Sequence, residues 1–81
     1  MPVRFEPRAL KDAERLAEAD RLAVLREIAA FVAGRAPNAD IRKLQGRAAY
    51  RLRIGRWRVL FERADAVVGV QRILDRKDAY R

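Results

Sequence analysis

The side chains of this chain that could do chemistry are mainly cationic, and they gather in one part of the sequence. Between positions 42 and 58 there are seven basic residues and no acidic residue. They are Arg42, Lys43, Arg47, Arg51, Arg53, Arg56 and Arg58. Residues 1–40 hold equal numbers of acidic and basic residues, so the second half of the chain supplies the whole formal net charge of +8.

This charge distribution predicts a polyanionic partner. Guanidinium groups bind phosphate oxygens through two parallel hydrogen bonds and stack on aromatic rings. A one-sided positive field attracts nucleic acid, an acidic protein segment or an anionic membrane surface. The alternative is an Arg-rich composition whose side chains are merely solvated. The neutral first half of the chain argues against that alternative, because a general composition bias would charge both halves.

The residue types that are missing exclude several kinds of chemistry. The chain has no cysteine, which excludes a disulfide framework, a thiol nucleophile and a thiolate metal site. It has no histidine, which removes most zinc sites and most Ser-His-Asp arrangements. We therefore expect no metal and no cofactor.

Length and hydropathy indicate one folded domain over residues 1–81. Apolar residues make up 51% of the chain, which is too many for a disordered protein. No apolar run approaches the ~18 residues of a membrane span, and the first residues lack the core of a signal peptide. We expect a soluble, cytoplasmic protein with no membrane partner.

The first half of the chain has helical spacing after a brief strand. Residues 3–5 alternate between apolar and polar and predict a short strand. Pro7 suits the first position of a helix, because its missing N–H costs nothing there. Apolar residues then recur at helical spacing, and the polar step before Asp20 predicts a helical hairpin with Asp20 as the cap of the second helix. Gly34 suits the end of that helix. A single bent helix is the alternative.

The second half changes to strand spacing. Residues 35–46 are predicted to form a connection, and residues 75–81 a polar tail. Three strands are predicted, at residues 50–54, 57–62 and 67–74, with turns at 55–56 and 63–66. The order βααβββ predicts an α+β fold: a small, mostly antiparallel sheet with the N-terminal helical hairpin packed on one face.

The strand alternation predicts where the cations lie. If the apolar residues of the first of these three strands pack under the helices, Arg51 and Arg53 point to the other face of the sheet. Arg58 belongs to the next strand and lies close to them across the hairpin. Three guanidinium groups at this spacing repel one another, and a phosphate would relieve the repulsion. The alternative is a solvated sheet face with independent arginines.

Four stretches, in the same order along nearly the whole chain, carry a family pattern. They are residues 5–11 (FEPRALK), 43–46 (KLQG), 50–61 (YRLRIGRWRVLF) and 76–81 (RKDAYR). They resemble the strand-to-helix entry, the K-L-x-G connection, the Y-R-x-R-x-G-x-x-R-x-x-(Y/F) hairpin and the H-R-x-x-x-Y-R close of the RelE/ParE superfamily, the bacterial toxins of type II toxin–antitoxin pairs. The combination and the matching length carry the resemblance, which implies a RelE-like fold.

The resemblance implies an enzyme, a metal-independent and ribosome-dependent mRNA endoribonuclease. Family members of the RelE type cut messenger RNA in the ribosomal A site, where the 2′-hydroxyl attacks the adjacent phosphate. Cationic residues bind the phosphates, and a C-terminal tyrosine takes part or stacks on a base. Carried over position by position, the catalytic residues are Arg51, Arg53, Arg58, Arg76 and Tyr80.

Arginine cannot lose its proton near neutral pH, so these arginines could act only as electrostatic clamps. The group that takes the proton of the 2′-hydroxyl is open. Tyr80 is one candidate if nearby cations lower its pKa, and Glu62, Asp75 and Asp78 are further candidates. Tyr80 could instead be an aromatic residue that pins the tail to the body of the protein.

One departure from the family pattern and two alternative functions remain to be considered. Many relatives have His where this chain has Asp75, and a carboxylate there weakens the attraction for phosphate. ParE-type members share the fold, lack the nuclease residues and inhibit DNA gyrase. Retention of Arg76 and Tyr80 favours the nuclease type. A non-enzymatic nucleic-acid-binding module is a third possibility.

Either kind of toxin implies a cognate antitoxin. The resemblance implies a longer protein with a DNA-binding part and a segment that wraps the toxin, in a complex that can be of higher order. The net charge of +8 predicts that the wrapping segment is acidic, as an amphipathic helix laid in a groove.

Overall fold

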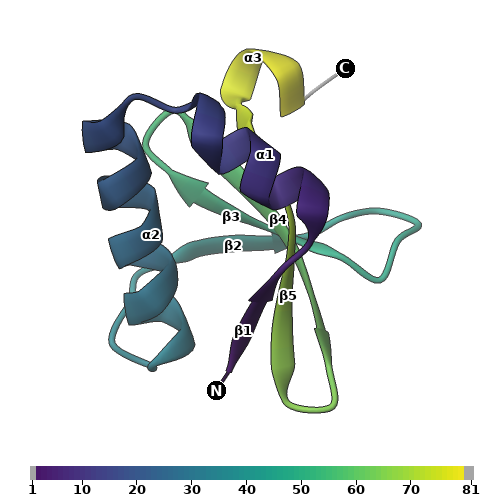
Figure 1. The fold of residues 1–81 in the computed structure, drawn as a ribbon. Helices are drawn as coiled ribbons and strands as arrows, with labels where there is room; N and C mark the ends of the chain where they lie inside the picture. Colours follow the sequence, from purple (N-terminus) through teal and green to yellow (C-terminus); the bar gives the residue numbers. More distant parts are fainter. Residues whose placement is uncertain (1, 80–81) are drawn as a thin grey trace.

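The computed structural model describes residues 2–79, which form a five-stranded sheet with two long helices and one short one (Figure 1). The elements in chain order are β1 (Val3–Phe5), α1 (Pro7–Arg15), α2 (Glu18–Val32), β2 (Asp40–Lys43), β3 (Tyr50–Ile54), β4 (Trp57–Ala64), β5 (Val67–Asp75) and α3 (Arg76–Ala79). The strand order across the sheet is β1-β5-β4-β3-β2. The short β1 runs parallel to β5, and the other three pairings are antiparallel.

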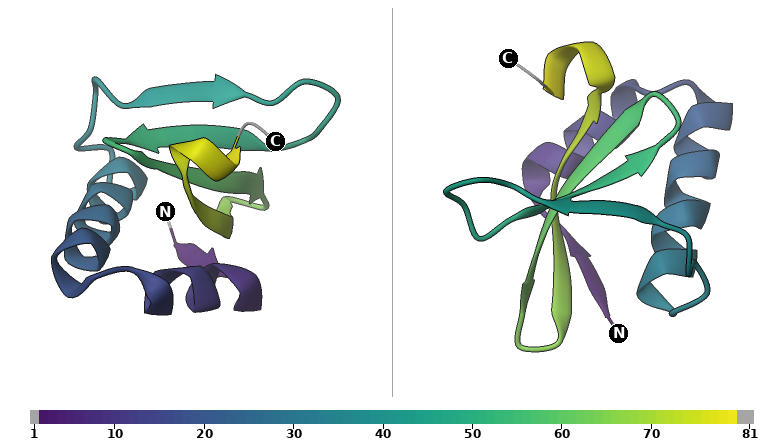
Figure 2. Two further views of the ribbon diagram at one scale, coloured as in Figure 1. Left: turned by 90° about the horizontal axis from the view of Figure 1, so that it is seen from above. Right: turned by 180° about the vertical axis from the view of Figure 1, so that it is seen from behind.

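The two long helices pack against the same side of the twisted sheet, and α3 follows β5 at its end (Figure 2). The core contains Ala9 and Leu16 of the first helical segment, Val24 and Ile28 of α2, and alternate residues of β3, β4 and β5. This arrangement confirms the expected α+β fold with the helical hairpin on one face. Of the helices in residues 2–79, none is long and apolar enough to cross a membrane.

The ends of the helices follow from a few residues. Pro7 begins α1 as expected, and Glu6 before it is extended and makes no side-chain capping bond. The prediction that Asp20 caps the second helix is wrong, because α2 already begins at Glu18 and Asp20 lies in its first turn. Gly34 ends α2 with a φ of +75°, a conformation that glycine adopts without steric cost.

The alternation of β3 and β4 has the predicted sense. Leu52, Val59 and Phe61 are buried under the helices, and Phe61 packs against Tyr50 with ring centroids 5.5 Å apart. Arg51 occupies the alternate position of β3, on the face opposite the helices, which we call the open face.

A bulge in β5 decides the side on which its later residues lie. Phe61 pairs with Val70, whereas the preceding Leu60 pairs with Arg72, so Gln71 is an extra residue. In strict alternation Arg72 would share the core face with Val70. The bulge turns Arg72 away from the core and lets Ile73 enter it, where it is 3% exposed.

Two elements were not predicted from the sequence. The expected connection over residues 35–46 contains β2, an edge strand whose single strongly apolar residue, Ile41, gives no alternation to detect. The expected polar tail begins with the four-residue helix α3. The turn between β4 and β5 is also shorter than predicted, since β4 extends to Ala64 and β5 starts at Val67.

Candidate functional site

The β3–β4 hairpin holds three of the predicted site residues in different surroundings. Arg53 on β3 is the cross-strand partner of Arg58 on β4. The Arg53 side chain is 53% exposed, whereas the Arg51 side chain is only 12% exposed. Asp40 of β2 lies next to both, with its two carboxylate oxygens 3.5 Å from Arg51 Nη2 and 3.8 Å from Arg53 Nη1. The open face therefore contains an acidic residue between two of its predicted cations.

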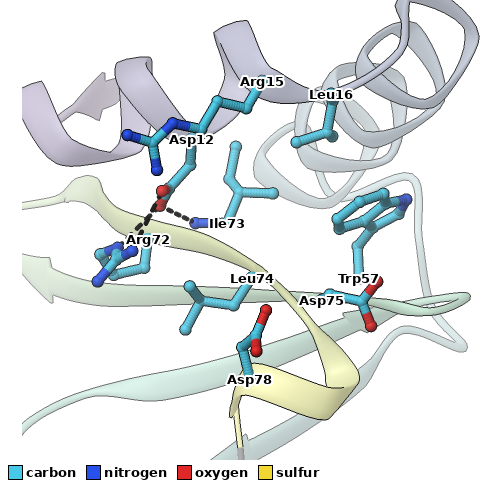
Figure 3. Close-up of a pocket in the computed structure, with 9 residues that line it drawn as sticks. All are labelled: Asp12, Arg15, Leu16, Trp57, Arg72, Ile73, Leu74, Asp75 and Asp78. Atoms are coloured by element: carbon cyan, nitrogen blue, oxygen red, sulfur yellow. Dashed lines mark hydrogen bonds and ion pairs between the residues drawn. The ribbon is translucent and has the colours of Figure 1, made fainter.

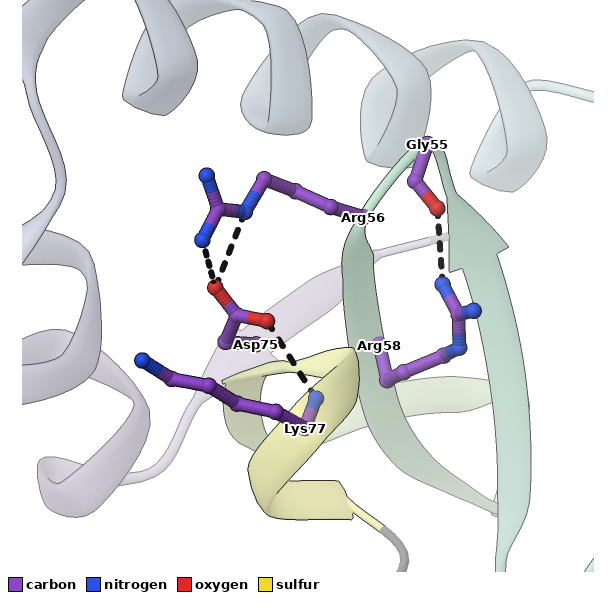
Figure 4. Close-up of polar contacts among 5 residues, drawn as sticks. All are labelled: Gly55, Arg56, Arg58, Asp75 and Lys77. Atoms are coloured by element: carbon purple, nitrogen blue, oxygen red, sulfur yellow. Dashed lines mark hydrogen bonds and ion pairs between the residues drawn. The ribbon is translucent and has the colours of Figure 1, made fainter.

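Arg58 does not extend from the sheet as the sequence predicted. The residue is 4% exposed. Its Nη1 donates hydrogen bonds to the carbonyl oxygen of Gly55 at 2.7 Å and to that of Trp57 at 3.1 Å. Figure 4 shows the side chain lying along the hairpin toward the Gly55 turn. Arg58 thus holds the β3–β4 turn, because its guanidinium donates hydrogen bonds to two carbonyl groups at that turn.

Arg53 and Arg76, from separate segments, do come together. Both line a hollow of about 560 Å³ beside the β3–β4 turn. We call it the basic hollow, and its lining residues are Arg53, Gly55, Arg56, Asp75, Arg76 and Lys77. The backbone N–H of Arg76 donates to the carbonyl oxygen of Arg56 at 2.8 Å, which fixes the start of α3 against the turn.

Two of the cations in the basic hollow were not among the predicted site residues. Arg56 lies in the acid-free run of the sequence but falls on a turn rather than on the alternating strand. Lys77 follows Arg76 directly, and only the short helix α3 brings it to the same hollow. The acid-free run was a usable signal for Arg56. The sequence held no signal for α3 and hence none for Lys77.

Asp75 is the one acidic residue among the described residues that line the basic hollow. Its Oδ2 accepts a hydrogen bond from Arg56 Nε at 2.8 Å and a second one from Arg56 Nη2. Its Oδ1 accepts from the backbone N–H of Lys77 at 3.2 Å. The hydrogen bonds from Arg56 hold the pKa of the Asp75 carboxyl below its ordinary value, so the group is a carboxylate at neutral pH.

Arg51 faces a second hollow, of about 420 Å³, on the open face. Its lining residues are Arg42, Lys43, Leu44, Gln45, Arg47, Arg51, Leu60 and Ala79. Cationic and apolar side chains thus line this hollow together. Tyr80, the fifth predicted site residue, lies outside the described residues.

A third hollow, of about 440 Å³, lies between α1 and the end of β5 (Figure 3). Here the buried carboxylate of Asp12 accepts hydrogen bonds from Arg72 Nε at 2.8 Å, Arg72 Nη2 at 3.1 Å and the backbone N–H of Ile73 at 2.9 Å. Burial raises the pKa of the Asp12 carboxyl, but these hydrogen bonds outweigh burial and hold the pKa below its ordinary value.

The place of Ile73 in the sheet explains this contact. β1 pairs with β5 only as far as Val70, so the N–H of Ile73 lies beyond the end of that pairing. Asp12 of α1 supplies the missing acceptor, and Arg72 neutralises its charge. The pair holds the helix on the sheet edge, and its polar groups are already engaged with each other. Within residues 2–79 no three His, Cys, Asp or Glu side chains form a group that could hold a metal ion.

The fold is the one found in solved structures of RelE and YafQ. The isolated RelE toxin of E. coli superposes with a TM-score of 0.74 at 22% identity, over 98% of this chain and 89% of that chain. RelE in the RelB–RelE complex of Methanococcus jannaschii gives 0.71 at 24% identity, over 95% and 94%. YafQ of E. coli strain BL21(DE3) gives 0.74 at only 8% identity, over 98% and 97%. At these low sequence identities the structural similarity establishes a shared fold and nothing more.

The family follows from the sequence. The model of the family described as the ParE toxin of the type II toxin–antitoxin system parDE matches residues 3–80. The chain therefore belongs to this family, and with its RelE-like fold it is a type II toxin of the RelE/ParE superfamily, as the resemblance indicated. None of the curated protein sequences matches it.

Proposed function

We propose that this toxin is an mRNA endoribonuclease that acts on the ribosome and binds the RNA backbone at the basic hollow. The observation that carries the proposal is the meeting of four cations at one hollow: Arg53, Arg56, Arg76 and Lys77. They come from two segments that are 20 residues apart in the sequence, and the Arg76–Arg56 backbone bond fixes these segments together. Such a cluster of donors is suited to phosphate oxygens.

The reaction needs two kinds of group. The 2′-oxygen attacks the adjacent phosphorus, the bond from phosphorus to the 5′-oxygen breaks, and a 2′,3′-cyclic phosphate forms. One proton leaves the 2′-oxygen and one is taken up by the departing 5′-oxygen, so the protons balance. The arginines stabilise the negative charge that grows on the phosphate oxygens, each contributing about 10²–10³-fold in rate.

The proton transfers need a different group, because guanidinium keeps its protons. We propose Tyr80 for the proton of the 2′-oxygen, since cations favour the phenolate. Arg51, at the second hollow, would bind a neighbouring phosphate of the same strand. Arg58 supports the site indirectly by holding the β3–β4 turn from which Arg56 extends.

An antitoxin partner belongs to the same proposal. The solved relatives from Methanococcus jannaschii and Mycobacterium tuberculosis are toxins in complex with antitoxins. For this chain we propose an acidic antitoxin segment that covers the open face, with a DNA-binding part elsewhere in the antitoxin. An acidic segment would neutralise the cations that otherwise bind RNA.

Inhibition of DNA gyrase is the second candidate function. The match to the ParE family favours it, and so does Arg58, which is buried and donates to carbonyl groups of its own hairpin. A toxin that acts by contact with a protein does not need the catalytic groups of a nuclease.

One pair of assays separates the two functions. Purified toxin is added to ribosomes programmed with a defined mRNA, and the RNA ends are mapped; in parallel, DNA supercoiling by gyrase is measured. The proposal expects cleavage at the A-site codon, lost in Arg76→Ala and kept in Arg26→Ala, which removes an exposed arginine of α2. No cleavage, together with gyrase inhibition that Arg76→Ala leaves intact, would establish the second candidate instead.

A further inference from the structure

The backbone fixes Arg56 and Asp75 beside each other. Asp75, the last residue of β5, is the register partner of Trp57, which follows Arg56. The next residue, Arg76, donates its N–H to the carbonyl oxygen of Arg56 at 2.8 Å. The carboxylate and the guanidinium therefore meet without any rearrangement of the chain.

The Asp75 carboxylate occupies donors that an anionic ligand of the basic hollow would use (Figure 4). One of its oxygens accepts from Arg56 Nε at 2.8 Å, and the other accepts from the backbone N–H of Lys77 at 3.2 Å. A phosphate would also present two oxygens of one anionic group. These oxygens could accept the same hydrogen bonds from the guanidinium and the N–H. The other side chains of the hollow described here are three cations, those of Arg53, Arg76 and Lys77.

The two partners of the ion pair differ in exposure. The Arg56 side chain is 60% exposed, whereas the Asp75 side chain is 12% exposed. The guanidinium can leave the pair toward a ligand in solvent, while the carboxylate stays fixed at the start of α3. An incoming phosphate therefore replaces the Asp75 carboxylate as the partner of Arg56.

We propose that Asp75 is an internal competitor of the anionic ligand of the basic hollow, because both bind Arg56. This competition sets the number of phosphates that a ligand must bring in order to bind. An isolated phosphate that takes Arg56 from Asp75 exchanges one anion for another and gains little. A nucleic-acid strand also reaches Arg53, Arg76 and Lys77, so it gains side-chain contacts for which Asp75 does not compete. Asp75 thus selects polynucleotides over small phosphates. The inference rests on the proposed function in taking a nucleic-acid backbone as the ligand.

Binding can be tested apart from cleavage. A single-stranded 2′-deoxy oligonucleotide lacks the 2′-hydroxyl and cannot react by the proposed chemistry. Inorganic phosphate serves as the small anion. Trp57, the only tryptophan of the chain, has its ring centroid 5.3 Å from the guanidinium carbon of Arg56, so its fluorescence reports on release of Arg56.

Two variants with the same change in charge are compared. Asp75→Asn keeps an acceptor for the Lys77 N–H and removes the charge. The matched control, Asp78→Asn, changes an exposed residue of α3 that does not line the basic hollow. Exposed ion pairs are worth roughly 0–1 kcal/mol, which is up to about a fivefold change in affinity. We expect Asp75→Asn to tighten phosphate binding by about two- to fivefold and Asp78→Asn by less than about 1.5-fold.

The salt dependence and a double variant give independent readouts. For Asp75→Asn the plot of log affinity of the oligonucleotide against log salt concentration should steepen by about 0.7, the value for one more neutralised phosphate on a single strand. In an Arg56→Gln background, Asp75→Asn should have no effect on phosphate binding beyond that of Asp78→Asn.

Each result decides the inference. Equal tightening by the two Asn variants, or an Asp75→Asn effect that persists in the Arg56→Gln background, would overturn it, and so would no measurable anion binding by Asp75→Asn. These failures leave RNA cleavage by the wild type, and hence the proposed function, untouched. Conversely, if Asp75→Asn binds phosphate more tightly but the protein cleaves no RNA, the competition by Asp75 is upheld and the nuclease function is rejected.

Discussion

Arg53 and Arg58 face each other across the β3–β4 hairpin, but only one of them presents its charge to solvent. Arg58 is 4% exposed and donates to the carbonyl groups of Gly55 and Trp57, whereas the Arg53 side chain is 53% exposed and lines the basic hollow. Like charges directly opposite in a sheet are destabilising. The hairpin avoids that cost because one of the two guanidinium groups turns to its own backbone.

Replacing Arg58 should therefore affect stability first. Arg58→Met keeps a long side chain but removes the donors to Gly55 and Trp57. We expect the free energy of unfolding to fall by roughly 1–3 kcal/mol, the cost of leaving buried polar groups without partners. Urea denaturation followed by Trp57 fluorescence measures the loss. Arg53→Met, at the exposed partner position, should stay within about 0.5 kcal/mol of wild type. A fully stable Arg58→Met protein that no longer binds RNA would instead make Arg58 a direct ligand contact.

The contact between Asp12 and Arg72 should be a major source of stability. Asp12→Ala leaves the N–H of Ile73 and the Arg72 guanidinium without their acceptor. Removal of one partner of a buried pair costs about 3–5 kcal/mol, and Arg72 is partly solvated, so we expect about 2–3 kcal/mol. The loss is measured by thermal or urea unfolding. Glu14→Ala, which removes an exposed carboxylate of α1, is the control and should change little.

Asp12 should also shape the response to acid. Its folded-state pKa lies below the ordinary value of 3.8, so its contribution is complete above that pH and is lost as the pH falls through the folded-state pKa. Wild-type stability should drop steeply below about pH 4, whereas Asp12→Asn, already weaker at pH 7, should lose less over the same range. If acid lowered the free energy of unfolding equally in the two proteins, Asp12 would not be held ionised by its contacts.

The β4–β5 turn offers a stabilising change. Asp65 and Ala66 both have positive φ, of 52° and 62°, as in the two-residue turns that favour Asp-Gly. Alanine in this conformation carries a steric cost of about 1–2 kcal/mol that glycine avoids, partly offset by the greater freedom of glycine in the unfolded chain. Ala66→Gly should therefore raise the free energy of unfolding by about 0.5–1 kcal/mol. Ala64→Gly, in the adjoining strand, should lower it, and stabilisation by both would contradict the conformational reason.

The open face can be tested as the antitoxin surface. Arg51→Glu with Arg53→Glu reverses two charges on that face and should weaken RNA cleavage and capture by an acidic antitoxin segment together. The control pair, Arg8→Glu with Arg26→Glu, makes the same change in net charge on the exposed surfaces of α1 and α2. Affinity for the cognate antitoxin is measured by titration calorimetry at two salt concentrations. Unchanged affinity in the open-face variant, or equal loss in the control, would show that the antitoxin binds elsewhere.

Local patterns were sufficient to predict most of the fold. The alternation of Tyr50, Leu52 and Ile54 gave the strand and its buried face, and Pro7 and Gly34 marked helix ends correctly. β2 was not predicted because Ile41 is its single strongly apolar residue, which leaves no alternation to detect. The bulge at Gln71 was not predicted because it depends on how β5 pairs with β4 and not on the type of the residue itself.

The candidate site was predictable only in part, because its geometry depends on contacts between distant residues. Arg53 and Arg76 line one hollow, whereas Arg51 lines another. The burial of Arg58 follows from the turn carbonyls beside it, which a residue pattern does not record. Asp12 and Arg72 are 60 positions apart, and neither residue type signals the other in the sequence.

The place of β5 in the sheet bears on when the fold can form during synthesis of the chain. β5 is the last of the five strands to be translated, yet it lies between β1 and β4 and carries the start of α3. A nascent polypeptide that still lacks β5 has neither a closed sheet nor Arg76 and Lys77 in position. The sheet and the basic hollow can therefore be completed only after β5 and the residues that follow it have been synthesised.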